Sequence, residues 1–104
     1  MDIRINEVCL QQLLIARPTA DKCLRISAEH EGGGCGCMIS VGLRWDERRL
    51  DDVYAVADSL CVVLDQPTRM LLDATWYDLD FRVNLGYILK SSQETVAYGI
   101  RFTN

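Results

Sequence analysis

The chain has 104 residues, of which 49% are hydrophobic and 25% charged, so it can bury the core of one compact domain and is not a disordered chain. Its net charge of −4 argues against nucleic acid as a partner, because phosphate binding needs a basic stripe that the sequence lacks. No apolar run approaches the roughly 20 residues that cross a bilayer. We therefore expect a single domain over residues 1–104, without a secretory signal, located in the cytoplasm and with no membrane partner.

The N-terminal part predicts a strand followed by a helix. Residues 1–5 alternate between apolar and polar side chains, which favours a short strand. Asn6 is a good helix N-cap, and Pro18 ends the helix that follows. The spacing of apolar residues in this helix predicts an inward-facing stripe made of Leu10, Leu13 and Leu14.

Two alternating segments then flank a glycine-rich stretch. Residues 22–29 place Leu24, Ile26 and Ala28 on one face of a strand. Residues 37–45 alternate again, with the apolar face Ile39, Val41, Leu43 and Trp45. We expect these strands to form a hairpin across the glycine-rich stretch.

The remaining chain predicts more strands and one short helix. The charged stretch from Asp46 to Asp52, in which Arg48 and Arg49 lie between acidic residues, is interpreted as a solvated loop. A short helix over residues 67–73 begins at Pro67 and turns Met70 and Leu71 inward. Strands are predicted over 53–57, 60–64, 75–81, 86–90 and 96–102. The fold class is α+β, with mostly antiparallel strands in a distorted sandwich or partial barrel and two helices.

The cysteines fall into two groups. Cys9, Cys23 and Cys61 lie in segments with apolar neighbours, where a cysteine usually behaves as a small hydrophobic residue. An odd count of five cysteines with irregular spacing makes a disulfide framework the poorer interpretation, and cytoplasmic thiols stay reduced.

Cys35 and Cys37 differ because they lie in the glycine-rich stretch EHEGGGCGC, residues 29–37. Glycine allows a close approach of the backbone to a ligand, and two thiolates one residue apart can reach one metal ion. Zinc and iron–sulfur sites normally have four protein ligands, so a two-fold dimer would be needed to supply four thiolates. The alternative is a glycine turn with two incidental cysteines.

His30 is the single histidine and lies five residues before Cys35. It can serve as a further metal ligand or as a proton donor near the thiols. The alternative for His30 is a surface residue at the end of a strand. The flanking residues Glu29 and Glu31 fit a solvated surface better than a site for a hard cation.

The order of these elements, and above all the strand–GGGC–strand unit LRISAEHEGGGCGCMISVGL, resembles the HesB/IscA-like iron–sulfur cluster biosynthesis domain, in particular its shorter core branch. The resemblance covers nearly the whole chain. It implies a HesB-like fold, iron or an iron–sulfur cluster as cofactor, assembly or recipient proteins as partners, and a homodimer. It also implies a carrier or scaffold and not an enzyme.

The family's carriers use one cysteine of the glycine loop and a C-x-C pair near the C-terminus. Cys35 matches the loop cysteine, whereas the last residues, SSQETVAYGIRFTN, contain no such pair. Cys37, His30 or a second subunit would have to replace it. Two alternatives remain: an interaction or regulatory domain that keeps the fold without the cluster, and a thiol redox protein that exchanges with a partner thiol.

Overall fold

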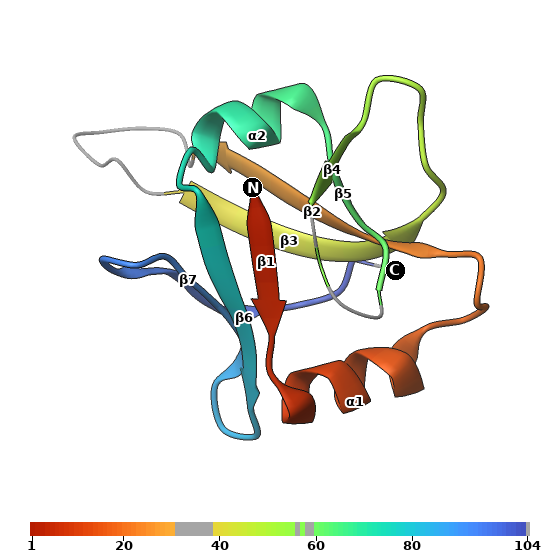
Figure 1. The fold of residues 1–104 in the computed structure, drawn as a ribbon. Helices are drawn as coiled ribbons and strands as arrows, with labels where there is room; N and C mark the ends of the chain where they lie inside the picture. Colours follow the sequence, from red (N-terminus) through yellow and green to blue (C-terminus); the bar gives the residue numbers. More distant parts are fainter. Residues whose placement is uncertain (31–38, 56, 58–59, 104) are drawn as a thin grey trace.

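A computed structural model describes residues 1–30, 39–55, 57 and 60–103. Figure 1 shows the order of the elements along these residues. They are β1 (Asp2–Ile5), α1 (Glu7–Ala16), β2 (Cys23–His30), β3 (Ile39–Asp46), β4 (Val53–Ala55), β5 (Val62–Leu64), α2 (Gln66–Leu71), β6 (Trp76–Arg82), β7 (Gly86–Lys90) and β8 (Thr95–Ile100).

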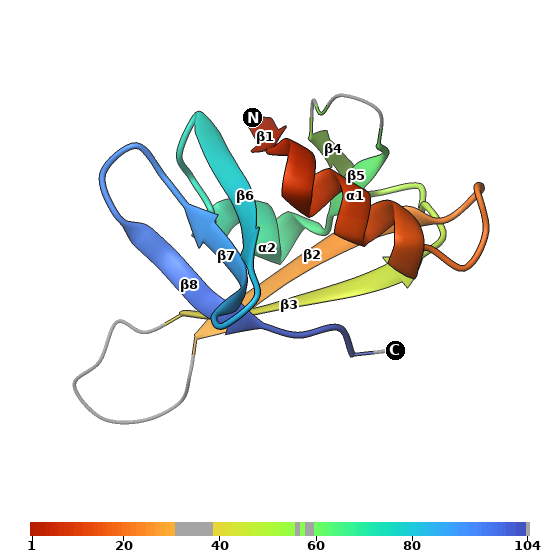
Figure 2. The same ribbon diagram turned by 90° about the horizontal axis from the view of Figure 1, so that it is seen from below.

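The strands form two mixed sheets. One has the order β1-β6-β7-β8 and the other the order β3-β2-β5-β4. Within each sheet one neighbouring pair is parallel, β1 with β6 and β2 with β5, and the other pairs are antiparallel. The predicted α+β class with mostly antiparallel strands is therefore confirmed. The two sheets do not close into a barrel. Figure 2 shows α1 and α2 placed beside the sheets.

The core lies between the two sheets because each strand presents its apolar positions to the same side. The predicted face of β2 is confirmed, since Leu24, Ile26 and Ala28 are all buried. The buried residues include Leu24, Ile26, Ala28, Leu43, Trp45, Tyr77, Leu79, Tyr87 and Leu89. The two sheets touch where Leu43 of β3 forms an isolated parallel bridge with Phe102.

Helix α1 begins where the sequence predicts, but it is rotated about its axis. The Asn6 side chain accepts a hydrogen bond of 2.8 Å from the backbone N–H of Cys9, which confirms the N-cap. Leu13 is fully buried, whereas Leu14 is exposed, so the predicted stripe is wrong at that position. Cys9 takes its place in the core, because it lies four residues before Leu13 on the same face.

Helix α2 shows a similar rotation. Met70 is 79% exposed, so the prediction that it faces inward is wrong. Leu71 is half-buried against the core, as predicted, and the fully buried residues are Thr68 within the helix and Leu72 at its C-cap. The Thr68 hydroxyl accepts a hydrogen bond of 3.1 Å from the backbone N–H of Ala28, which fixes α2 against the edge of β2.

The charged stretch after β3 is exposed over residues 47–51, as the sequence predicts, but Asp46 and Asp52 at its two ends turn toward the sheet and correct the interpretation there. The side chain of Arg25, only 4% exposed, points from β2 toward this stretch. Asp52 accepts two hydrogen bonds from the guanidinium, of 2.9 and 2.6 Å, and its own side chain is 1% exposed. Asp46 accepts a third, of 2.9 Å, from Arg25 Nε. Charge neutralisation explains why an arginine can be buried on this strand.

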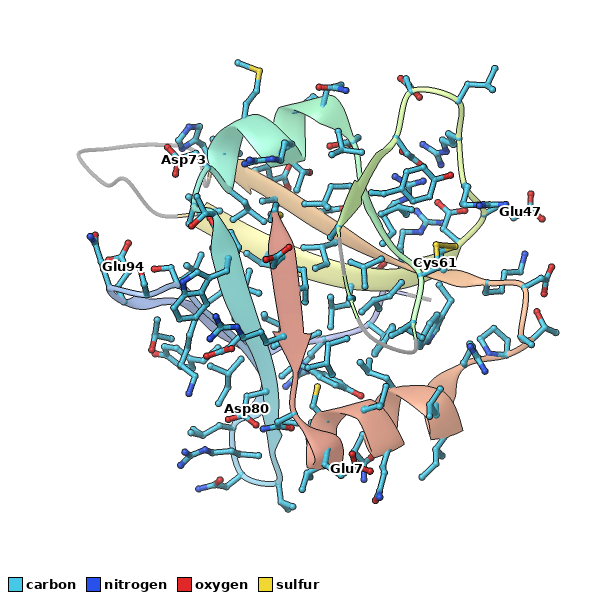
Figure 3. All side chains as sticks on the ribbon, in the orientation of Figure 1. Glu7, Glu47, Cys61, Asp73, Asp80 and Glu94 are labelled. Atoms are coloured by element: carbon cyan, nitrogen blue, oxygen red, sulfur yellow. A yellow bond between two sulfur atoms is a disulfide. The ribbon has the colours of Figure 1, made fainter. Side chains whose placement is uncertain are left out.

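Cys23 and Cys61 form a disulfide, which corrects the prediction that all buried cysteines are separate hydrophobic residues. Figure 3 shows this bond beside the label of Cys61. The two residues lie side by side because Leu24 pairs with Val62 in the parallel register of β2 and β5. The spacing of the cysteines in the sequence does not show that β2 and β5 pair, so the disulfide could not be predicted from it.

Candidate functional site at the end of the hairpin

The candidate site lies at the end of the β2–β3 hairpin. The two strands pair over their whole length, from Cys23 opposite Asp46 to His30 opposite Ile39. Residues 31–38 therefore connect two residues that face each other across the hairpin. The hairpin predicted from the two alternating segments is confirmed.

Cys35 and Cys37 lie outside the described residues, as do Glu31 and the glycines before Cys35. His30 is described: it is the last residue of β2 and is exposed. The residues that the structure describes contain no group of three or more His, Cys, Asp or Glu side chains placed to hold one metal ion. The role of Cys35, Cys37 and His30 as iron or cluster ligands thus stays a prediction.

Two hollows meet at Ile39, the first described residue after this connection. The larger has a volume of about 870 Å³ and extends along β8. The smaller, about 390 Å³, lies between the end of α2 and the turn that joins β7 to β8. Ile39 and Val96 line both hollows and separate them.

The two hollows differ in charge. Asp73 and Glu94 line the smaller one, and Figure 3 shows both on the side of the molecule where the hairpin ends. Arg82 and Lys90 line the larger one. Sequence reasoning singles out none of these four residues, because they come from separate elements and form no motif.

Helix α2 contacts the hairpin close to the end where its two strands connect. Asp65 caps this helix by accepting a hydrogen bond of 2.9 Å from the backbone N–H of Thr68. Hydrogen bonding by Thr68, only partly opposed by burial, keeps the pKa of Asp65 below its usual value, so the cap is charged at neutral pH. Thr68 in turn binds Ala28, two residues before the end of β2.

Cys9 is a free cysteine, but it is far from being a reactive thiolate. Its side chain is fully buried, and burial together with the charge of Asp80 raises its pKa to about 12. A thiol with such a pKa stays protonated at neutral pH and is a poor nucleophile and metal ligand. The structure therefore confirms the prediction that Cys9 acts as a small hydrophobic residue.

No protein-family model and no curated protein matches the sequence. Solved structures do match the fold. One is the crystal structure of a "putative Fe-S biosynthesis protein" from Lactobacillus acidophilus, with a TM-score of 0.74 and 15% identity over 98% of this chain and 88% of that one.

A second structure carries the same description, from Lactobacillus salivarius, and is noted for a novel fold. Its TM-score is 0.71, with 9% identity over 98% of this chain and 96% of that one. At such low identities the likeness establishes a shared fold and nothing further. None of the described helices is long and apolar enough to span a membrane.

Proposed function

We propose that this chain is an iron–sulfur assembly-related protein of the HesB/IscA-like type, which carries iron or a cluster on Cys35 and Cys37. His30 is proposed as a further ligand. In this role the protein is a carrier or scaffold and not an enzyme, and iron or the cluster is its cargo. Its partners are proteins that supply or receive that cargo.

The register of the hairpin is the observation that carries the proposal. His30, the last residue of β2, pairs with Ile39, the first residue of β3. Residues 31–38, which include the glycines, Cys35 and Cys37, therefore connect the two strands at one end of the hairpin. The solved structures with the same fold, both described as a "putative Fe-S biosynthesis protein", support this assignment.

The chemistry of the residue types fits such cargo. Thiolates bind iron in clusters, and a neutral imidazole is a common ligand of transition metals. Two thiolates leave coordination positions open, which suits a carrier that must release its cargo. We propose that a second copy of the chain supplies the remaining thiolates in a homodimer.

Anaerobic reconstitution with iron and sulfide tests the proposal. The expected result is bound iron and a visible charge-transfer absorbance, which Cys35→Ser and Cys37→Ser abolish and His30→Gln weakens. Cys9→Ala is the matched control, because it removes a thiol that is buried and protonated, and it should leave the absorbance unchanged. If the wild-type protein binds no iron, the proposal is refuted.

A second candidate function is that of an interaction domain that keeps this fold without a cluster. The two hollows on either side of Ile39 favour it, because they offer a binding surface that needs no metal. Partner binding that is unchanged in the cysteine variants, together with absence of bound iron, would support this candidate.

A further inference from the structure

We propose that the open edge of β3, together with the groove along β8, binds an extended segment of a partner protein as an added strand. The segment that fits alternates apolar residues with carboxylates. This proposal rests on the described residues of β3, β7 and β8, and it holds whether or not Cys35 and Cys37 carry iron.

The edge of β3 is the first part of the argument. β3 is the outer strand of its sheet. The N–H of Leu43 donates to the carbonyl of Arg101 at 3.4 Å, and its carbonyl accepts from the N–H of Thr103 at 3.0 Å, so both groups point away from β2. In a strand, every second residue has the same orientation. The backbone groups of Val41 and Ile39 therefore point outward as well.

Those outward groups have no backbone partner among residues 1–30, 39–55, 57 and 60–103. Two nearby positions of this sheet are covered: Arg101 and Thr103 cover Leu43, and the Thr68 hydroxyl covers Ala28 of β2. An uncovered edge is a template for another strand, which proteins commonly use to bind extended peptides.

The groove beside this edge supplies an apolar surface for the side chains of such a segment. It is about 870 Å³ in volume, within the range of pockets that bind ligands. Ile88 lines it and is only 6% exposed, although it lies on the opposite face of β7 from the core residues Tyr87 and Leu89. Tyr98 of β8, 72% exposed, also lines the groove.

The groove lies directly beside the open edge of β3. Strands β3 and β8 meet where Leu43 pairs with Phe102, and Figure 2 shows them diverging from this point toward the start of β3. The groove is lined by residues 39–41 of β3 and 95–100 of β8, so it occupies this opening. A strand paired with β3 there would continue the edge that Arg101 and Thr103 begin to cover.

The charge of the groove indicates which kind of segment it binds. The charged side chains among the described residues that line the groove are Arg82 and Lys90, both cationic, in a chain with a net charge of −4. Lys90 lies 3.8 Å from Asp80, at the limit of an ion pair. A segment with carboxylates complements this groove, whereas a second copy with the same face would bring like charges together.

The test uses the full chain and a fluorescein-labelled, capped nonapeptide in which valine or isoleucine alternates with glutamate. We expect saturable binding by fluorescence anisotropy, and shifts of the amide resonances of Ile39 and Val41 in NMR spectra. Arg82→Glu combined with Lys90→Glu should weaken binding at least about tenfold. Arg17→Glu combined with Arg48→Glu, the control with the same change of charge, should not alter it.

Two methylated peptides test the strand pairing. In one, every glutamate is N-methylated, and in the other every valine and isoleucine. Because alternate N–H groups of a strand point to opposite edges, one peptide should lose at least about tenfold in affinity and the other should not. Equal binding of the two refutes strand addition.

The remaining outcomes also decide the matter. Binding that is equal for a peptide with lysine in place of glutamate refutes the charge argument. A dimer in which the amide groups of Ile39 and Val41 are protected from hydrogen exchange without peptide, and which the peptide does not dissociate, shows that a second copy covers the edge and overturns the proposal. Thermal unfolding of each variant establishes that it is folded, so loss of binding reports on the groove.

Discussion

Replacing Asp52 with asparagine tests the account of the buried charge cluster. Asp52 accepts two hydrogen bonds from the Arg25 guanidinium and one of 2.7 Å from the backbone N–H of Arg49. The asparagine amide would keep an oxygen for one of these bonds, but it would leave the buried cation with Asp46 as its remaining carboxylate. The Asp52→Asn variant should therefore be strongly destabilised.

The magnitude follows from the burial of both partners. Side chains with exposures of 4% and 1% are hardly screened by solvent, so the pair is unlike a surface ion pair. Breaking a buried pair by removing one partner costs about 3–5 kcal/mol. Because Asp46 still neutralises part of the charge, we expect a loss of about 3 kcal/mol in the free energy of unfolding, which lowers Tm by more than about 10 °C.

Urea unfolding followed by circular dichroism measures this loss. Asp51→Asn is the matched control, since it makes the same change in charge at the neighbouring exposed residue. It should change the free energy of unfolding by less than about 0.5 kcal/mol. If the Asp52 variant loses no more than the Asp51 variant, the buried cluster does not stabilise the fold and the reasoning is wrong.

Two further predictions concern pH and the disulfide. Hydrogen bonding by Arg25 keeps the pKa of Asp52 below its unfolded value of about 3.9, so its stabilising contribution is present above that pH and lost as the pH falls through the folded-state pKa. Urea unfolding between about pH 6 and pH 3 should show this decline, and Asp52→Asn should flatten it. Reduction of Cys23–Cys61, which are 38 residues apart, should lower the free energy of unfolding by about 2–4 kcal/mol. Unfolding with and without dithiothreitol measures it, and an unchanged midpoint in urea would contradict the prediction.

The strands could be predicted from the sequence because their side chains alternate between two faces. Residues 75–81 alternate so regularly that β6 and its buried face, Tyr77 and Leu79, follow directly. The hairpin could also be predicted, since two alternating segments flank the glycines. The pairing of distant strands could not: β2 lies beside β5, and β1 beside β6, through contacts that leave no local signal.

The helix faces were harder to predict than the strands. A rotation of less than one position exchanges the residues at the two borders of an apolar stripe, so the pattern places Leu14 and Met70 inward although the core receives Cys9 and Thr68. Cys9 is smaller than a leucine and Thr68 is polar, so neither belongs to the stripe of large apolar side chains from which the inward faces are predicted. The hydroxyl of Thr68 is buried because it binds Ala28, a contact between residues 40 positions apart.

In the candidate site, too, local features could be predicted from the sequence and contacts between distant residues could not. The glycine-rich motif could be found from sequence alone, because it is a local run of unusual composition. Arg82, Lys90 and the edge of β3 could not, since they come together through two sheets that meet at Leu43 and Phe102.

The position of Ile39 relates the proposed binding of iron or a cluster to the proposed binding of a partner strand. Ile39 ends the connection that contains Cys35 and Cys37, and its backbone begins the open edge proposed to bind a partner. A strand added at Ile39 and Val41 would therefore begin opposite His30, one of the proposed ligands, and two residues after Cys37 in the sequence. If both proposals hold, bound peptide should change the rate at which a chelator removes iron, whereas Arg82→Glu combined with Lys90→Glu should remove this effect without lowering the iron content.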